Sequence, residues 1–150
     1  MTANCLICGK AGQVNQCYLA VETRVSVILV DLADDKHDLQ INWWNWRPIL
    51  AFLREANLIE NEQFERMGAN GCGGQLTAEE ALKAAAFLKR EIIPWMKDDE
   101  RMHADGQVST APRALRPISS LTSHELYAAR KSCVESFVSF CEASKGFEVL

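Results

Sequence analysis

The segment from residue 77 to about residue 96 carries the strongest local structural signals in the chain. Thr77 and Glu80 have the spacing of a capping box, in which side chains and backbone N–H groups at a helix start satisfy one another. Apolar residues then recur at helical spacing and share one face: Ala78, Ala81, Leu82, Ala85, Leu88 and Ile92. Pro94 lacks the N–H that a continuing helix needs. These signals predict an amphipathic helix whose apolar face must be buried against other elements.

A second helix is predicted just before this one. Asn45 is a suitable N-cap, and Pro48 is tolerated in a first turn, where its missing N–H would have no partner anyway. One face of this helix then carries apolar side chains and ends near Asn57: Ile49, Phe52, Leu53 and Ala56. A short helix over residues 62–67 is expected to stop at Gly68.

The C-terminal part of the sequence predicts a further helix. Thr122 and Glu125 form a second possible capping box. Gly146 is predicted to be the residue that follows the helix end, a position where glycine is common. The buried face of this helix would carry Leu126, Ala129, Cys133, Phe137 and Cys141.

The N-terminal third is ambiguous. Residues 25–30 form a β-branched run that favours a buried strand, followed by a charged turn, "ADDKHD". A helix remains the alternative for this segment, because four apolar residues also recur at helical spacing: Val21, Val25, Ile28 and Leu32. The resulting prediction is a mainly α fold, with one compact helical domain over residues 1–150 and a small β element in the N-terminal third. Residues 1–12 are expected to be mobile, and the long polar loop 103–121 is expected to be either functional or mobile.

Bulk composition restricts the function classes. A chain of 150 residues, 48% apolar and 24% charged, is typical of one globular domain. The net charge of −4 argues against general nucleic-acid binding, which needs a basic face, and it suits a partner protein with a basic surface. No export signal and no run long enough to span a bilayer is visible, so we expect a cytoplasmic protein without membrane contact. Its six cysteines are then expected to be reduced thiols or metal ligands.

The N-terminal stretch "CLICGK" has the spacing of half a zinc site. Cys5 and Cys8, followed by Gly and Lys, resemble the knuckle of zinc ribbons over these six residues. A closed site needs four ligands, and the sequence holds no second CxxC. Cys17 would be a third ligand and His37 or Cys72 a fourth, without a recognised spacing. A zinc-stabilised interaction module using Cys5 and Cys8 is therefore an alternative, and buried reduced thiols without any cofactor are favoured.

Three tryptophans and an arginine occur together in "INWWNWRP". Trp43, Trp44, Trp46 and Arg47 belong to the residue types most enriched in binding hot spots. The competing interpretation is that two of the three indoles face the core and fix the helix entry. Since consecutive residues cannot point the same way, at least one indole is expected at the surface.

The glycine-rich loop "GANGCGGQ" places Cys72 shortly before a helix N-terminus, where a thiol can be activated. A catalytic Cys72 would also need a base, for which only His37, His103 and His124 are available. The loop lacks the Lys-Ser/Thr of a P-loop, and it is more simply a connection that needs glycine. A thiol-dependent enzyme with Cys72 as nucleophile is thus a second alternative.

Acidic residues gather in "DLADDKHD". Asp31, Asp34, Asp35 and Asp38 surround His37, and they could bind a hard cation or a basic partner surface. The pattern matches no EF-hand loop, and a solvated turn is the simpler interpretation.

Together these features favour a small non-catalytic binding protein, such as an immunity or inhibitor protein that occludes a toxin or an enzyme. Trp44, Trp46 and Arg47 would anchor the partner, while Asp34, Asp35 and Asp38 would steer its basic surface. No catalytic residues are assigned.

Overall fold

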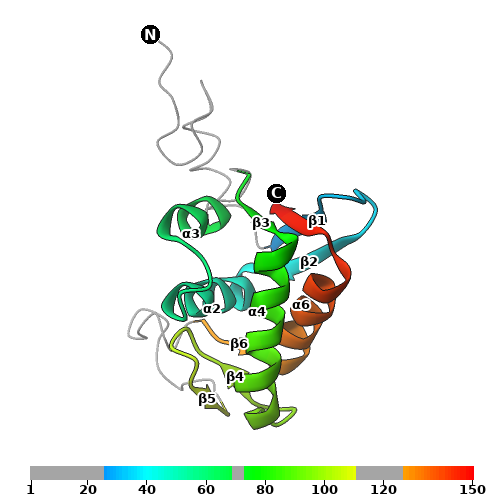
Figure 1. Ribbon diagram of the computed structural model, residues 1–150. Helices are drawn as coiled ribbons and strands as arrows, with labels where there is room; N and C mark the ends of the chain where they lie inside the picture. Colours follow the sequence, from blue (N-terminus) through cyan, green and yellow to red (C-terminus); the bar gives the residue numbers. More distant parts are fainter. Residues whose placement is uncertain (1–25, 69–72, 111–126) are drawn as a thin grey trace.

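The computed structural model describes residues 26–68, 73–110 and 127–150. Within these ranges the chain forms four α-helices and seven strands, and the strands build two antiparallel sheets (Figure 1). The prediction of a mainly α domain with one small β element is therefore wrong, because the protein has a mixed α/β fold. The predicted strand and turn of the N-terminal third are confirmed as β1 (Ser26–Asp31) and the residues that follow it.

The larger sheet has the strand order β2-β1-β7-β3. It contains β2 (Asp38–Asn42), β1, β7 (Gly146–Val149) and β3 (Gln75–Thr77), and each neighbouring pair is antiparallel. β7 therefore lies inside the sheet and joins β1 to β3. Alternate side chains of β1 are buried, with Val27 and Leu29 facing the core while Ile28 faces the opposite side.

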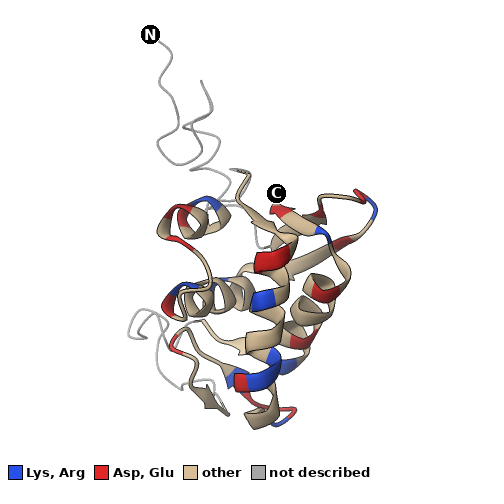
Figure 2. Ribbon diagram, in the orientation of Figure 1, with Lys and Arg blue, Asp and Glu red and all other residues tan. Residues whose placement is uncertain are grey.

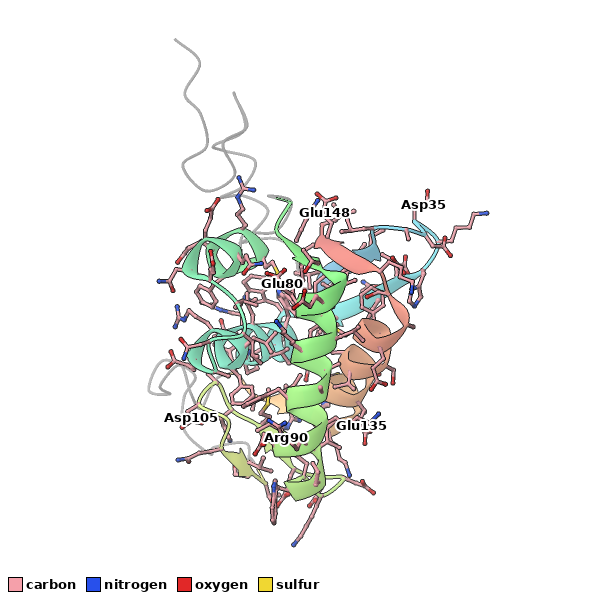
Figure 3. All side chains as sticks on the ribbon, viewed as in Figure 1. Asp35, Glu80, Arg90, Asp105, Glu135 and Glu148 are labelled. Carbon is pink, nitrogen blue, oxygen red and sulfur yellow. The ribbon has the colours of Figure 1, made fainter. Side chains whose placement is uncertain are left out.

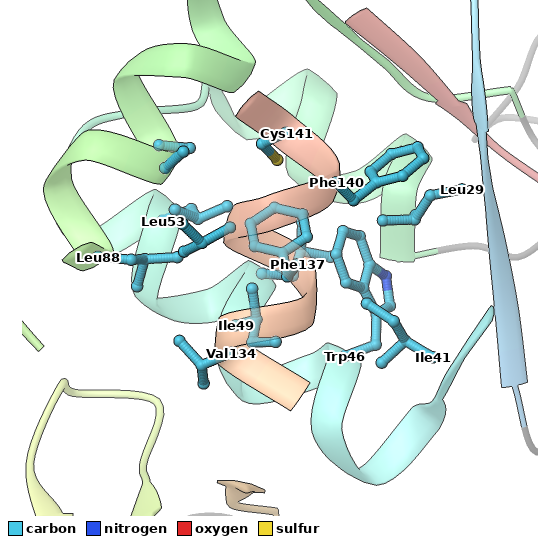
Figure 4. Packing of buried hydrophobic residues seen from close by; sticks show 14 of the residues in the cluster. Leu29, Ile41, Trp46, Ile49, Leu53, Leu88, Val134, Phe137, Phe140 and Cys141 are labelled. Atoms are coloured by element: carbon cyan, nitrogen blue, oxygen red, sulfur yellow. The ribbon is translucent and has the colours of Figure 1, made fainter. Parts of the chain in front are cut away.

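The core lies between one face of this sheet and three helices, α2 (Trp43–Glu55), α4 (Ala78–Glu91) and α6 (Lys131–Ala143) (Figure 4). α4 and α6 pack against each other in front of the sheet in Figure 1, and α3 (Asn61–Gly68) flanks α2 and β3. The aromatic part of the core includes edge-to-face pairs of Phe137 with Trp46 and with Phe147.

A second, small sheet with the order β5-β4-β6 closes the other end of the helices. It consists of β4 (Arg101–Met102), β5 (Val108–Ser109) and β6 (Ala129–Arg130). Residues 103–109, the first part of the predicted loop, form the turn of the β4–β5 hairpin and its second strand. The predictions for residues 1–12 and 111–121 lie outside the described residues.

Helix starts differ in how well the sequence located them. The capping box of Thr77 and Glu80 is confirmed: the Thr77 N–H donates to Glu80 Oε2 at 2.8 Å, and the Glu80 N–H donates to Thr77 Oγ1 at 3.2 Å. α2, however, begins at Trp43 with Asn42 as its N-cap, so Asn45 is not the cap and Pro48 lies inside the helix. Asn42 was not considered in the sequence analysis, although it lies three residues before Asn45 and has the same side chain.

Helix ends and the start of α6 also needed correction. α4 ends at Glu91, and the residues around Pro94 form a 3-10 helix, Ile93–Trp95, because proline cannot continue the α-helical bonds. α6 begins at Lys131 and not near Thr122, since Ala129 and Arg130 pair with β4. The second capping box lies outside the described residues.

Gly146 is also not the residue after the helix end, because α6 ends at Ala143 with Ser144 as its C-cap. Gly146 opens β7 with a φ of +90°, in contact with β3. An added Cβ would lie 2.7 Å from the Leu76 carbonyl oxygen, so only glycine fits this approach.

Candidate functional site

The three tryptophans of the predicted cluster separate into core and surface. Trp46 is completely buried, and its Nε1–H donates to the Met67 carbonyl oxygen at 3.1 Å. The indole thereby satisfies its only polar atom inside the protein while its rings pack on Phe137. Trp46 is thus not available to a partner, although the sequence hypothesis included it as an anchor.

Trp44 lies on the opposite side of α2, where it is 46% exposed. Its indole stacks on Tyr127, with 5.1 Å between ring centroids and an interplanar angle of 33°. The Arg47 guanidinium lies 4.8 Å from the centre of the Tyr127 ring and 5.6 Å from that of Trp43. Its Nη1 also donates to the Tyr127 hydroxyl at 3.4 Å. We call these four residues, Trp43, Trp44, Arg47 and Tyr127, the α2 aromatic cluster.

A buried amide holds the two halves of the α2 aromatic cluster together. Asn45 is only 3% exposed, and its side chain donates to Asn42 Oδ1 at 2.6 Å. Its Oδ1 accepts the backbone N–H of Arg130 at 2.8 Å, which ties the residues after Tyr127 to the first turn of α2. The cluster therefore rests on fixed backbone on both sides. The sequence analysis did not identify Tyr127 or this role of Asn45, because 81 residues of chain lie between position 45 and position 127.

The acidic turn connects β1 to β2 and forms the other end of β2. Asp31, at 6% exposure, accepts three hydrogen bonds: from His37 Nδ1 at 2.9 Å, from the Ala33 N–H at 2.9 Å and from the Lys145 N–H at 3.1 Å. The bond from His37, followed by that from Ala33, holds the pKa of Asp31 below its usual value of 3.8, with burial opposing them. Asp31 thus fixes the turn to the start of β7 and is not a free ligand.

The remaining acidic side chains of the turn are exposed to solvent. Figure 2 shows in red where acidic residues lie along this turn. Asp34 accepts the N–H of Lys36 at 3.0 Å and shapes the turn, while Asp35 projects from its tip (Figure 3). Asp38 opens β2. The turn and the α2 aromatic cluster stand at opposite ends of β2, so the five strand residues separate them by about 16 Å. A partner must therefore cover the length of β2 to contact both.

A groove with a volume of about 550 Å³ lies between the β2 end of the turn and the exposed face of α6. Its lining comes from residues 37–39 and from five residues of α6: Ser132, Glu135, Ser136, Ser139 and Phe140. The His37 ring packs on Phe140, with 4.9 Å between the two ring centroids. We call this the β2–α6 groove. In the sequence, the only pattern that corresponds to this groove is the recurrence of serines on one helix face. That pattern is also typical of an ordinary solvated face.

The thiol-based hypotheses receive little structural information. Cys5, Cys8, Cys17 and Cys72 all lie outside the described residues, as does His124. Cys141 is in the core, where burial raises the pKa of its thiol. Among the described residues, no three His, Cys, Asp or Glu side chains are grouped so as to hold a metal ion, and no helix has the length and apolarity to cross a membrane.

Comparison with known proteins adds no assignment. No family model, curated protein or solved structure matches this chain.

Proposed function

We propose that this protein is a non-catalytic binding protein that occludes a partner protein, as an immunity or inhibitor protein does, and that the α2 aromatic cluster is its anchor. The supporting observation is the exposed stack of Trp44, Arg47 and Tyr127. These are the three residue types that dominate binding hot spots, and here Tyr127 contacts both Trp44 and Arg47 at the surface.

The support beneath the cluster strengthens this proposal. A side chain that is already held in one geometry loses less conformational freedom on binding. The hydrogen bonds of Asn45 to Asn42 and Arg130 hold the backbone under both aromatic rings before any partner arrives. A rigid amphipathic aromatic surface is what an anchor in a stoichiometric complex requires.

Asp34, Asp35 and Asp38 add electrostatic steering in this proposal. They are exposed at one end of β2, and the partner is expected to present basic residues there. Steering of this kind acts mainly on the association rate and weakens as salt is added.

The test is affinity capture from the native host with three tagged proteins: the wild type, Trp44→Ala and Trp95→Ala. Trp95 is 73% exposed on the 3-10 helix and lies outside the cluster, so it is the matched control. We expect the wild type and Trp95→Ala to retain the same stoichiometric protein, and Trp44→Ala to bind it about 30-fold more weakly or worse. Equal capture by all three, or no stoichiometric partner at low salt, would refute the proposal.

A further inference from the structure

Strand β2 has an open edge beside the β2–α6 groove. The strand order β2-β1-β7-β3 leaves β2 paired on one side only, within the part of the chain that the structure describes. β2 contains no proline and no bulge interrupts its register with β1, two devices that commonly protect an edge. Its backbone is therefore competent to pair with a further strand.

The register shows which backbone groups are open. The Asp31 N–H donates to the His37 carbonyl, so in this antiparallel pair the alternate residues Leu39 and Ile41 also point their backbone groups at β1. The two backbone hydrogen bonds between Ile28 and Leu150 agree with this register, because they point the N–H and C=O groups of Ile28 away from β2. The N–H and C=O groups of Asp38 and Gln40 consequently point outward from the edge.

The β2–α6 groove gives this edge a second wall. α6 lines it with three serines, whose short side chains leave space beside residues 37–39. A strand added to β2 would place alternate side chains over Leu39 and the α6 face, and the others beside Asp38 on the outer face of the sheet. The groove thus has room for side chains as well as for a backbone.

The charged side chains around the groove indicate what kind of segment would bind there. The carboxylates that line the groove are Asp38 and Glu135, and Asp34 and Asp35 stand at the adjoining turn. A residue directly opposite Asp38 in an added strand is favoured when it carries a positive charge. A second copy of this chain would bring its own acidic turn, so a basic segment of another protein is the better match.

We infer that β2 accepts an extended basic segment of the partner protein by strand addition in the β2–α6 groove. The inference rests on the proposed function, because it names how that partner is held. About six residues of the segment would span β2 from the acidic turn to the α2 aromatic cluster. The two separated surfaces would then belong to one continuous interface.

The first experiment uses the whole protein and a labelled peptide of about ten residues that alternates lysine with valine. Binding is measured by fluorescence anisotropy, with a glutamate-for-lysine peptide as the charge control. Two further peptides carry backbone N-methyl groups on alternate residues, in opposite phases. Only one phase removes the N–H groups that face β2, so we expect one phase to weaken binding about tenfold or more and the other by less than about threefold.

The second experiment changes the protein. Gln40→Pro removes an outward N–H without removing a backbone hydrogen bond to β1. Gln40→Ala is the matched control, because it keeps the N–H and loses the same side-chain hydrogen bond to Ser26. We expect only the proline variant to lose peptide affinity, by about tenfold, with both variants checked for cooperative thermal unfolding. If Gln40→Pro does not fold, the N-methylated peptides decide with the wild-type protein. Glu135→Lys should also weaken binding, whereas Glu65→Lys on α3 should not.

The outcomes separate the inference from the proposed function. Absent binding of the lysine peptide, equal loss in both N-methyl phases, or a chain dimer that Gln40→Pro dissociates would each overturn strand addition. Capture of the natural partner that depends on Trp44 would still stand in those cases. Peptide binding with the expected dependence on phase and on Gln40, but without any effect of Trp44→Ala on capture, would keep strand addition and refute the anchor.

Discussion

The two ends of strand β2 are each fixed by one buried polar side chain, but the two side chains differ in charge. At the aromatic end, the neutral amide of Asn45 bonds Asn42 and Arg130. At the acidic end, the carboxylate of Asp31 accepts bonds from His37, Ala33 and Lys145. Since only the carboxylate titrates, acid is expected to loosen one end of β2 and leave the support of the other intact.

Of the side chains that support the two ends of β2, Asn45 is expected to give the largest effect when it is replaced by alanine. The substitution leaves the Arg130 N–H without its acceptor beneath the surface and removes the bond to Asn42, so the free energy of unfolding should fall by about 2–3 kcal/mol. Urea unfolding at neutral pH measures the change. Asn61→Ala, at an exposed position that begins α3, is the control and should change it by less than about 0.5 kcal/mol. An equal effect of both substitutions would show that Asn45 does not fix this end.

The acidic end of β2 is expected to make the stability of the protein depend on pH. Because the pKa of Asp31 is lower in the folded protein than its usual 3.8, its ionised form stabilises the fold above that value, and this contribution is lost as pH falls through the folded pKa. Asp31→Asn should therefore be less stable than the wild type at neutral pH, and the difference should shrink as the pH is lowered below about 4.

Urea unfolding across this pH range provides the measurement, with Asp35→Asn at the exposed turn tip as the control. The control should show little difference from the wild type at neutral pH. A wild-type advantage over Asp31→Asn that stays constant down to strong acid would contradict the assignment.

The smallest effect on stability is expected from the substitution of the exposed Trp44. Trp44→Ala removes a half-exposed indole and its stack on Tyr127, so the unfolding free energy should fall by only about 1 kcal/mol. The same substitution at fully buried Trp46 should cost about 3–5 kcal/mol. Chemical denaturation of the two variants side by side tests this. A loss at Trp44 as large as at Trp46 would mean that the α2 aromatic cluster is structural.

The sequence predicted elements whose signals are local. The helix after Thr77 and the strand at residues 26–31 each carry a periodicity or a cap within a few residues. The two sheets were missed because strands such as β3 and β6 have only three and two residues, too few to show alternation. β7 pairs with β1 from more than a hundred residues away, a contact that no local pattern encodes.

The candidate surface was predicted in part for the same reason. Adjacent tryptophans predicted that at least one indole would be exposed, and Trp44 is exposed. The pattern could not say that Trp46 would satisfy its Nε1–H on Met67 inside the core, nor that Tyr127 would complete the stack. Both facts depend on the packing of α2 against segments that are distant in the sequence.

The position of β7 also has a consequence for synthesis on the ribosome. Residues 146–149 join β1 to β3, so a nascent chain that has not yet extruded them contains the β1–β2 hairpin with its second edge bare and β3 without a neighbour. The larger sheet can be completed only after translation has passed Val149. Until then, the growing polypeptide is expected to depend on chaperones that cover exposed strand edges.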